Sequence, residues 1–149
     1  MLLRTHLAIS LFFALLLFPF VNSKFIFFGM VFIATILPDV DSRFSRIGQK
    51  KLSRVLQFFT KHRGIIHSFT FLFGLTLVLV LFFPVFSLGF FLGYGLHLFS
   101  DSFTKDGIFP FYPLRVHWGG MIKTGGKSEV SVLVLFVFLD VLLILSYIL

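Results

Sequence analysis

Five long apolar runs dominate this chain and leave little room for a water-soluble fold. They cover roughly residues 2–20, 21–38, 65–83, 85–100 and 130–149 of the 149 residues. About 20 residues of α-helix cross the hydrocarbon core of a bilayer. Only 13% of the residues are charged, against about a quarter in a typical soluble domain. The sequence therefore predicts an all-α, polytopic membrane protein with about five transmembrane helices in a single domain over residues 1–149.

Two polar segments separate these runs. In residues 39–63, apolar side chains recur at helical spacing (Leu52, Val55, Leu56, Phe59), which predicts a short amphipathic helix at the headgroup level. Residues 101–129 are rich in Gly, Pro and aromatic residues, which favours an ordered loop with turns. The first apolar run is expected to be retained, because no small-x-small cleavage site follows it.

Most of the basic residues lie in these two polar segments. The formal net charge is +7, and membrane topology explains it without a nucleic-acid partner. Because cytoplasmic loops are enriched in Lys and Arg, both segments are expected to be cytoplasmic. The N-terminus is then cytoplasmic and the C-terminus extracytoplasmic, in the plasma (inner) membrane.

Histidines and acidic residues gather near the ends of the runs that should face the cytoplasm. Ionisable groups at membrane depth are costly and tend to be functional. The chain has no cysteine, so a metal site must use imidazole nitrogen and carboxylate oxygen. The candidates from this pattern are His6, Asp39, Asp41, His62, His67, His97, Asp101 and Glu129.

His97 and Asp101 are the best-defined pair. Four residues apart on a helix, they share one face, and Gly89 and Gly93 extend the same row. Small residues in such a row let two membrane helices approach closely, so this face should pack inward. The pair is interpreted as metal ligands, with a buried His–Asp hydrogen bond as the alternative.

The other candidates also have simpler interpretations. Asp39 and Asp41 follow Pro38, where the second run should end, and could be solvated loop acids or helix caps. His62 and His67 flank Gly64, whose turn could let both converge, or they belong to a basic flank. His6, taken alone, resembles a satisfied polar residue near a helix end.

Three further residues have interpretations of their own. Glu129 could take part in catalysis, or could interact with the dipole of a helix capped by Ser128. His117 is interpreted as structural or interfacial. Asp140 lies in the middle of the last run, on nearly the same face as Glu129, and should be protonated or paired inside the bundle.

Taken in order, these motifs resemble the YdjM-like inner-membrane proteins, described as metal-dependent membrane hydrolases. The most specific pieces are His62-Arg-Gly-x-x-His67-Ser and His97-x-x-x-Asp101-x-x-Thr104, and the similarity covers nearly the whole chain. The resemblance implies metal-ligand roles for His6, Asp39, Asp41, His62, His67, His97 and Asp101. Glu129 matches an end motif of the same family.

A divalent-metal hydrolase at the cytoplasmic membrane face is the function these residues favour. Zinc is expected, with manganese or iron as alternatives, as one or two ions. His62 or an acid such as Glu129 would transfer protons, and Arg63 would steady charge on a phosphoester or phospholipid. The alternatives are a metal or proton translocator and a non-catalytic protein with a structural metal.

Overall fold

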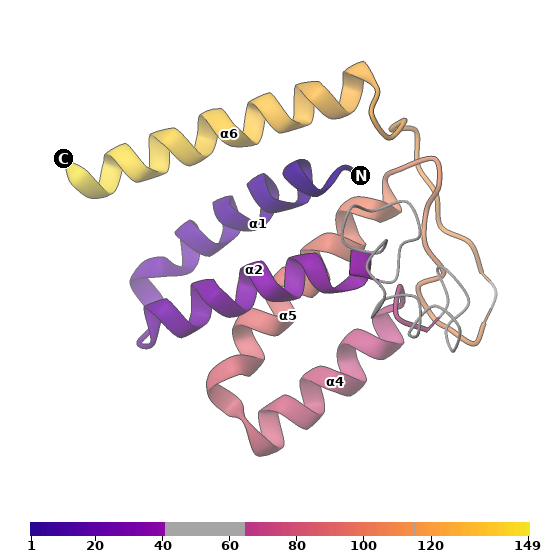
Figure 1. Cartoon of the computed structure of the whole chain (residues 1–149), viewed down its shortest axis with the longest axis horizontal. Helices are drawn as coiled ribbons and strands as arrows, with labels where there is room; N and C mark the ends of the chain where they lie inside the picture. The colour runs from indigo at the N-terminus through magenta and orange to yellow at the C-terminus, as the bar shows by residue number, and fades with distance from the viewer. Residues whose placement is uncertain (41–64, 115) are drawn as a thin grey trace.

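The apolar runs become helices. The computed structural model describes residues 1–40, 65–114 and 116–149. Over these ranges the chain forms five α-helices and one short 3₁₀ helix (Figure 1): α1 (Leu3–Leu17), η1 (Phe18–Phe20), α2 (Lys24–Val40), α4 (Phe69–Phe82), α5 (Pro84–Ser102) and α6 (Lys127–Ile148). The all-α prediction is confirmed. The amphipathic helix predicted around residues 52–59 lies outside the described residues.

Local chemistry explains where these helices start and stop. Ser68 caps α4 by accepting a hydrogen bond from the Phe71 N–H at 3.2 Å, so this helix begins at Phe69 rather than near residue 65. Pro84 opens α5 at a position where its missing N–H costs nothing. The predicted end of α2 at Pro38 is wrong, because the helix continues to Val40. Asp39 consequently lies in the last helical turn and not in a loop.

Two helix pairs make up most of the bundle. The predicted glycine face of α5 packs against α2, and a Cβ added at Gly93 would lie 2.2 Å from the Val31 carbonyl oxygen. Helices α1 and α6 run side by side in the same direction (Figure 1), joined near their starts by Glu129 and near their ends by Tyr147. The contacts of α1 with both α2 and α5 connect the two pairs.

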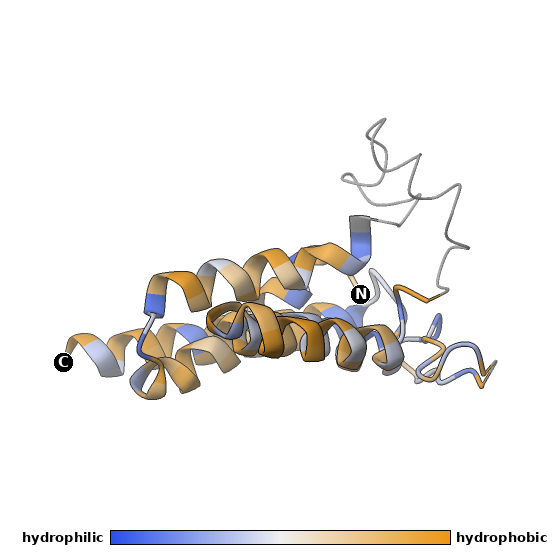
Figure 2. Ribbon diagram, turned by 90° about the horizontal axis from the view of Figure 1, so that it is seen from below, coloured by the Kyte–Doolittle hydropathy of each residue, from blue (hydrophilic) through white to orange (hydrophobic). Residues whose placement is uncertain are grey.

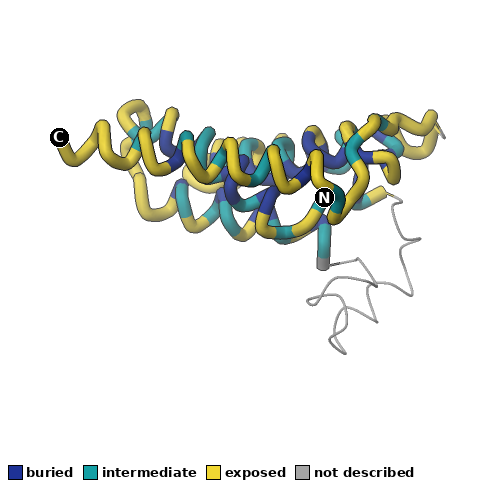
Figure 3. The backbone as a smooth tube through the Cα atoms, turned by 90° about the horizontal axis from the view of Figure 1, so that it is seen from above, coloured by how far each residue is buried: buried dark blue, intermediate teal, exposed yellow. Residues whose placement is uncertain are grey.

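The outer surface of the bundle is apolar. Figure 2 shows hydrophobic residues along the helices, and Figure 3 shows that much of their outer surface is exposed. Within the described part of the chain, two segments are long and apolar enough to cross a membrane: Leu3–Phe20 and Lys127–Ile148. Only 6% of the second segment is buried, so α6 does not resemble the core helix of a soluble protein. Helix α4 is apolar but shorter, and the predicted five spans are not confirmed.

The segment between α5 and α6 is an ordered loop with turns, as predicted. Two isolated bridges hold it together, one pairing Thr104 with Ile122 and the other pairing Ile108 with Trp118. Ile108 is fully buried in a hydrophobic cluster with Tyr94 and Leu98 of α5. The loop therefore closes the end of the bundle at which α5 stops and α6 starts.

Candidate metal centre

Five predicted ligands converge at one end of the bundle. They come from four parts of the chain: His6 from α1, Asp39 from α2, His67 from the turn before α4, and His97 and Asp101 from α5. The start of α1, the ends of α2 and α5 and the start of α4 all lie at this end (Figure 1). His6, Asp39 and His97 form one group whose ligand atoms lie within 4.8 Å of one another, and His67, His97 and Asp101 form another.

His97 is common to both groups, and its ring is held in one tautomer. Its Nδ1 lies 2.8 Å from the Thr35 carbonyl oxygen, which can only accept, so Nδ1 carries the proton. In the neutral ring Nε2 is then the atom with the lone pair, and it lies 3.6 Å from Oδ2 of Asp101 and 3.9 Å from Oδ1 of Asp39. A metal-binding histidine is commonly oriented by such a bond from its second nitrogen.

The His6 ring is oriented in the same way, by a hydrogen bond between its Nδ1 and Ser100. The Ser100 hydroxyl donates to the Leu96 carbonyl at 2.6 Å, so its oxygen is left to accept from Nδ1 of His6 at 2.9 Å. In the neutral ring Nε2 of His6 therefore also carries the lone pair, and it lies 3.3 Å from Oδ1 of Asp101. The His6 and His97 rings stack with centroids 4.0 Å apart at an interplanar angle of 8°. Two neutral rings fit this arrangement better than two imidazolium ions, which would repel each other.

Two imidazole lone pairs thus face carboxylate oxygens across a buried space. Neither Nε2 atom makes a hydrogen bond of normal geometry with a described residue, although both lie within ion-pair distance of Asp101. A protonated nitrogen would hydrogen-bond a carboxylate at about 2.7–2.9 Å, and the observed separations are longer. Two ligands bound about 2.1 Å from one tetrahedral ion lie about 3.4 Å apart. The 3.3 Å separation from His6 to Oδ1 and the 3.6 Å separation from His97 to Oδ2 are each close to the spacing of two ligands on one divalent cation.

Burial makes the fit to a cation stronger. His6 is 1% exposed and His97 0%, and Asp101 is also buried. A buried carboxylate facing acceptor nitrogens is costly unless a cation compensates it. The Met1 ammonium contacts Oδ1 of Asp101 and supplies one positive charge. It does not satisfy either Nε2 atom.

The described side chains provide for one ion rather than two. Each group contains His97, whose Nδ1 is occupied by Thr35 and whose Nε2 can bind a single ion. A second ion would need ligands from Asp41 or His62. Both of these, together with Arg63, lie outside the described residues.

Glu129 lies in neither metal group. Its Oε1 accepts from the Leu2 N–H at 2.5 Å and from the Thr5 hydroxyl at 2.9 Å, and its Oε2 accepts from the Gly125 N–H at 2.6 Å. The expected cap at Ser128 is wrong, because α6 begins at Lys127 with Gly126 in the cap position. Glu129 therefore joins the starts of α1 and α6.

The two remaining candidates, His117 and Asp140, lie in different parts of the fold. His117 lies in the exposed loop, where Nε2 contacts the Asp106 carbonyl, consistent with a structural role. Asp140 is buried on the same face of α6 as Glu129, and its Oδ1 has no hydrogen-bond partner in the described part of the chain.

Sequence reasoning missed Ser100 and Thr35, the residues that set the two tautomers. Ser100 had a detectable signal, since it lies between His97 and Asp101 on the inward part of α5. Thr35 acts through its backbone carbonyl, which no residue type would reveal.

Comparison with known proteins now places the chain. The model of the YdjM inner membrane protein family matches residues 1–148. The chain belongs to this family. Membership in the YdjM inner membrane family agrees with the apolar exterior and implies association with a lipid bilayer. No curated protein and no solved structure matches the chain.

Proposed function

We propose that this protein is a membrane-embedded, divalent-metal-dependent hydrolase whose site lies at the cytoplasmic face of the membrane. The observation that carries the proposal is the pair of unprotonated Nε2 atoms, on His6 and His97, that face Asp101 without a hydrogen-bond partner in the described structure. Zinc suits a set of imidazole and carboxylate ligands, and manganese or iron are alternatives. YdjM family membership and the two candidate ligand groups support the proposal.

In this proposal one of the two three-residue groups holds the ion, which leaves a coordination position open for water. When bound, such a metal supplies a Lewis acid and lowers the pKa of coordinated water. Ser100 and Thr35 orient His6 and His97 so that their lone pairs face the ion. Asp39 is half-buried, unlike the histidines, and so lies where a substrate would approach.

The segment before His67 would complete the site. His62 and Arg63 stand five and four residues before His67 in the sequence. We assign His62 to proton transfer or to metal binding, with Asp41 as a further ligand. The Arg63 guanidinium would stabilise negative charge on a phosphoryl oxygen. Glu129, also proposed earlier as catalytic, has contacts that favour a positioning role.

The substrate class follows from the place of the site. The metal groups lie at the end of the bundle where the two candidate spans begin. In the proposed topology five helices cross the bilayer, with the N-terminus cytoplasmic and the C-terminus extracytoplasmic. A site at this level would meet amphiphilic molecules, and we propose a phospholipid or a related phosphoester.

Hydrolysis by the purified protein tests this function. The protein is reconstituted in lipid, loaded with zinc or manganese, and offered a panel of phospholipids and soluble phosphoesters. We expect metal-dependent release of a phosphate-containing product, and its loss in Asp101→Asn. The control is His117→Ala, which removes an exposed histidine outside the candidate site. Metal-loaded protein that hydrolyses no member of the panel, or Asp101→Asn with full activity, would contradict the proposal.

A structural metal is the second candidate, and one observation favours it. The ligands come from four separate parts of the chain, and the histidines among them are buried. Such an ion would hold helix ends together without catalysis. Stable, stoichiometric metal with no hydrolysis and a large loss of thermal stability on metal removal would identify this role.

Translocation has less support. A path needs polar groups at several depths. The described ligands lie at one end of the bundle, and Asp140 is the deep acid of α6.

A further inference from the structure

The loop between α5 and α6, residues 103–126, has an inner side that is fixed to the bundle. Ile108 and Thr104 are fully buried. The Thr104 hydroxyl donates to the Asp101 carbonyl at 2.7 Å, and the Phe69 N–H donates to the Pro110 carbonyl at 2.8 Å. The loop is thus attached both to the last turn of α5 and to the first turn of α4.

The outer side of the same loop is apolar and exposed. Trp118 is held by two backbone hydrogen bonds with Ile108, at 2.8 and 2.9 Å, yet half of its surface is exposed. Met121 is 92% exposed. The remaining large apolar side chains exposed on the loop are Phe103, Phe111, Tyr112, Leu114 and Val116. Such a concentration of exposed apolar groups indicates a contact surface rather than a solvated loop.

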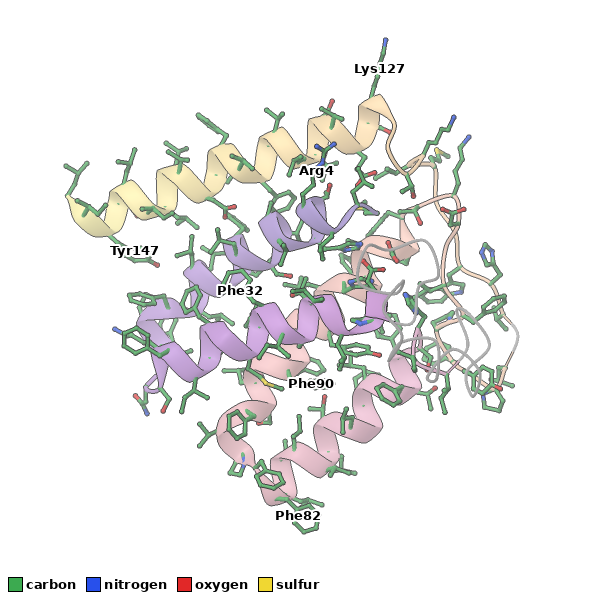
Figure 4. The ribbon with its side chains drawn as sticks, in the orientation of Figure 1. Arg4, Phe32, Phe82, Phe90, Lys127 and Tyr147 are labelled. Carbon is green, nitrogen blue, oxygen red and sulfur yellow. The ribbon has the colours of Figure 1, made fainter. Side chains whose placement is uncertain are left out.

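The position of the loop and its charge indicate the partner. The loop leads directly into Lys127, the first residue of a candidate membrane span. Lys105 and Lys123 are exposed on it, Lys127 points away from the bundle (Figure 4), and Asp106 is the one acid of the loop. Aromatic side chains beside lysines are typical of the membrane interface, where the rings lie among headgroups and the ammonium groups meet anionic lipids.

We propose that the outer side of this loop, formed by the exposed apolar side chains named above, lies in the headgroup region of the bilayer. Phe111 and Trp118 form an edge-to-face pair with centroids 6.0 Å apart, which gives this surface an ordered aromatic centre. Thr104 joins this lipid-facing loop to Asp101, so the loop fixes the depth of the candidate metal centre at the interface. This contact of the loop with lipid headgroups does not depend on bound metal or on catalysis.

Trp118 is the single tryptophan of the chain, so the native protein reports on its own loop. The full-length protein is placed in bilayers that contain anionic lipid, and its fluorescence is quenched from three positions: aqueous acrylamide, lipids brominated close to the carbonyl, and lipids brominated at the acyl-chain ends. We expect emission that is blue-shifted from that of the unfolded chain, strongest quenching by lipids brominated close to the carbonyl, and weak quenching by acrylamide.

Two relocated reporters calibrate the depth. In a Trp118→Phe background, Met121→Trp places the indole elsewhere on the outer side of the loop and should reproduce the native pattern. Phe138→Trp places it on the exposed face of α6, in the middle of the candidate span, where lipids brominated at the chain ends should quench most.

Two outcomes would overturn the proposed position of the loop among lipid headgroups. Acrylamide quenching of Trp118 as efficient as that of free tryptophan, with no effect of brominated lipid, would place the loop in water. Protection of Trp118 from both aqueous and lipid quenchers would mean that protein covers it, for example a second copy of the chain. Either result leaves metal content unaffected and so is distinguishable from failure of the metal centre.

Discussion

Helices α2 and α5 are joined by backbone proximity, whereas α1 and α6 are joined by side chains. At the first interface Gly89 and Gly93 let the two backbones meet, with no room for an added Cβ at either position. At the second interface Glu129 binds the start of α1, and Tyr147 donates to the Leu15 carbonyl at 2.8 Å.

The difference indicates how the candidate site is positioned. Close packing of α2 on α5 places the Thr35 carbonyl against His97, leaving the ring little freedom. His6 depends in addition on the longitudinal position of α1, to which the polar contacts with α6 contribute. We infer that the α2–α5 pair is the rigid part of the site, and that α1 is adjustable.

Substitution of Gly93 should have the largest effect. In Gly93→Ala the new methyl would lie 2.2 Å from a backbone oxygen of α2, so the helices must separate. We expect a loss of about 1–3 kcal/mol in stability, together with loss of bound metal. Thermal unfolding in detergent measures the first and elemental analysis the second.

Gly29→Ala is the matched control, because nothing lies within 4 Å of its Cβ position. It should be neutral, or stabilising by up to about 1 kcal/mol through lower chain entropy. Equal stability of the two variants would contradict the close-packing account.

Glu129→Gln should weaken the α1–α6 pair. The amide keeps one accepting oxygen and turns an NH₂ group towards a donor, which removes hydrogen bonds to a charged group worth about 1.5–3 kcal/mol. We expect lower thermal stability and weaker metal binding, with Ser128→Ala as an exposed neighbouring control. Abolished hydrolysis with unchanged stability and metal content would instead make Glu129 catalytic.

Ser100→Ala tests the contact between the α1–α6 pair and the α2–α5 pair, which His6 and Ser100 make. It removes the acceptor that fixes the His6 tautomer and leaves the packing of α5 intact. Loss of an outer partner of this kind typically lowers metal affinity about 10–100-fold. Competition with a chelator measures the change. Ser102→Ala, on the same helix but half-buried and bonded only to the Phe99 carbonyl among the described residues, should bind metal normally. The tautomer argument fails if both variants bind alike.

Tyr147→Phe should have the smallest effect. The substitution removes one neutral hydrogen bond at the far end of the α1–α6 pair, worth about 0.5–1.5 kcal/mol. We expect a small decrease in the unfolding midpoint and unchanged metal affinity, because Tyr147 lies at the opposite end of the α1–α6 pair from Arg4 and the start of α1 (Figure 4). A metal defect as large as that of Glu129→Gln would show that the whole α1–α6 interface positions the site.

Much of this architecture could be predicted because helical periodicity is local. The spacing of His97, Asp101 and the α5 glycines determines that they share a face, and burial of that face follows from its small residues. The convergence of His6 and Asp39 could be predicted only through the expected orientation of the helices.

The remaining details depend on contacts between distant parts of the chain. Glu129 and Leu2 are 127 residues apart in sequence, and their bond involves a backbone N–H that every non-proline residue carries. The Thr35 carbonyl is likewise a backbone group that every residue carries, so the sequence does not reveal its role. Pro38 misled the prediction of the α2 end, because proline is a poor residue inside a helix, yet α2 continues through it to Val40.

The metal content of the purified protein tests the central claim most directly. Wild-type protein and the near-isosteric variants His97→Gln and Asp101→Asn are purified with metal supplied, checked for helical content, and measured by elemental analysis beside His117→Ala. We expect a divalent metal in at least equimolar amount in the wild type and in His117→Ala, and its loss in the two site variants. A folded wild type without metal, or site variants that retain it, would contradict a shared cation among these residues.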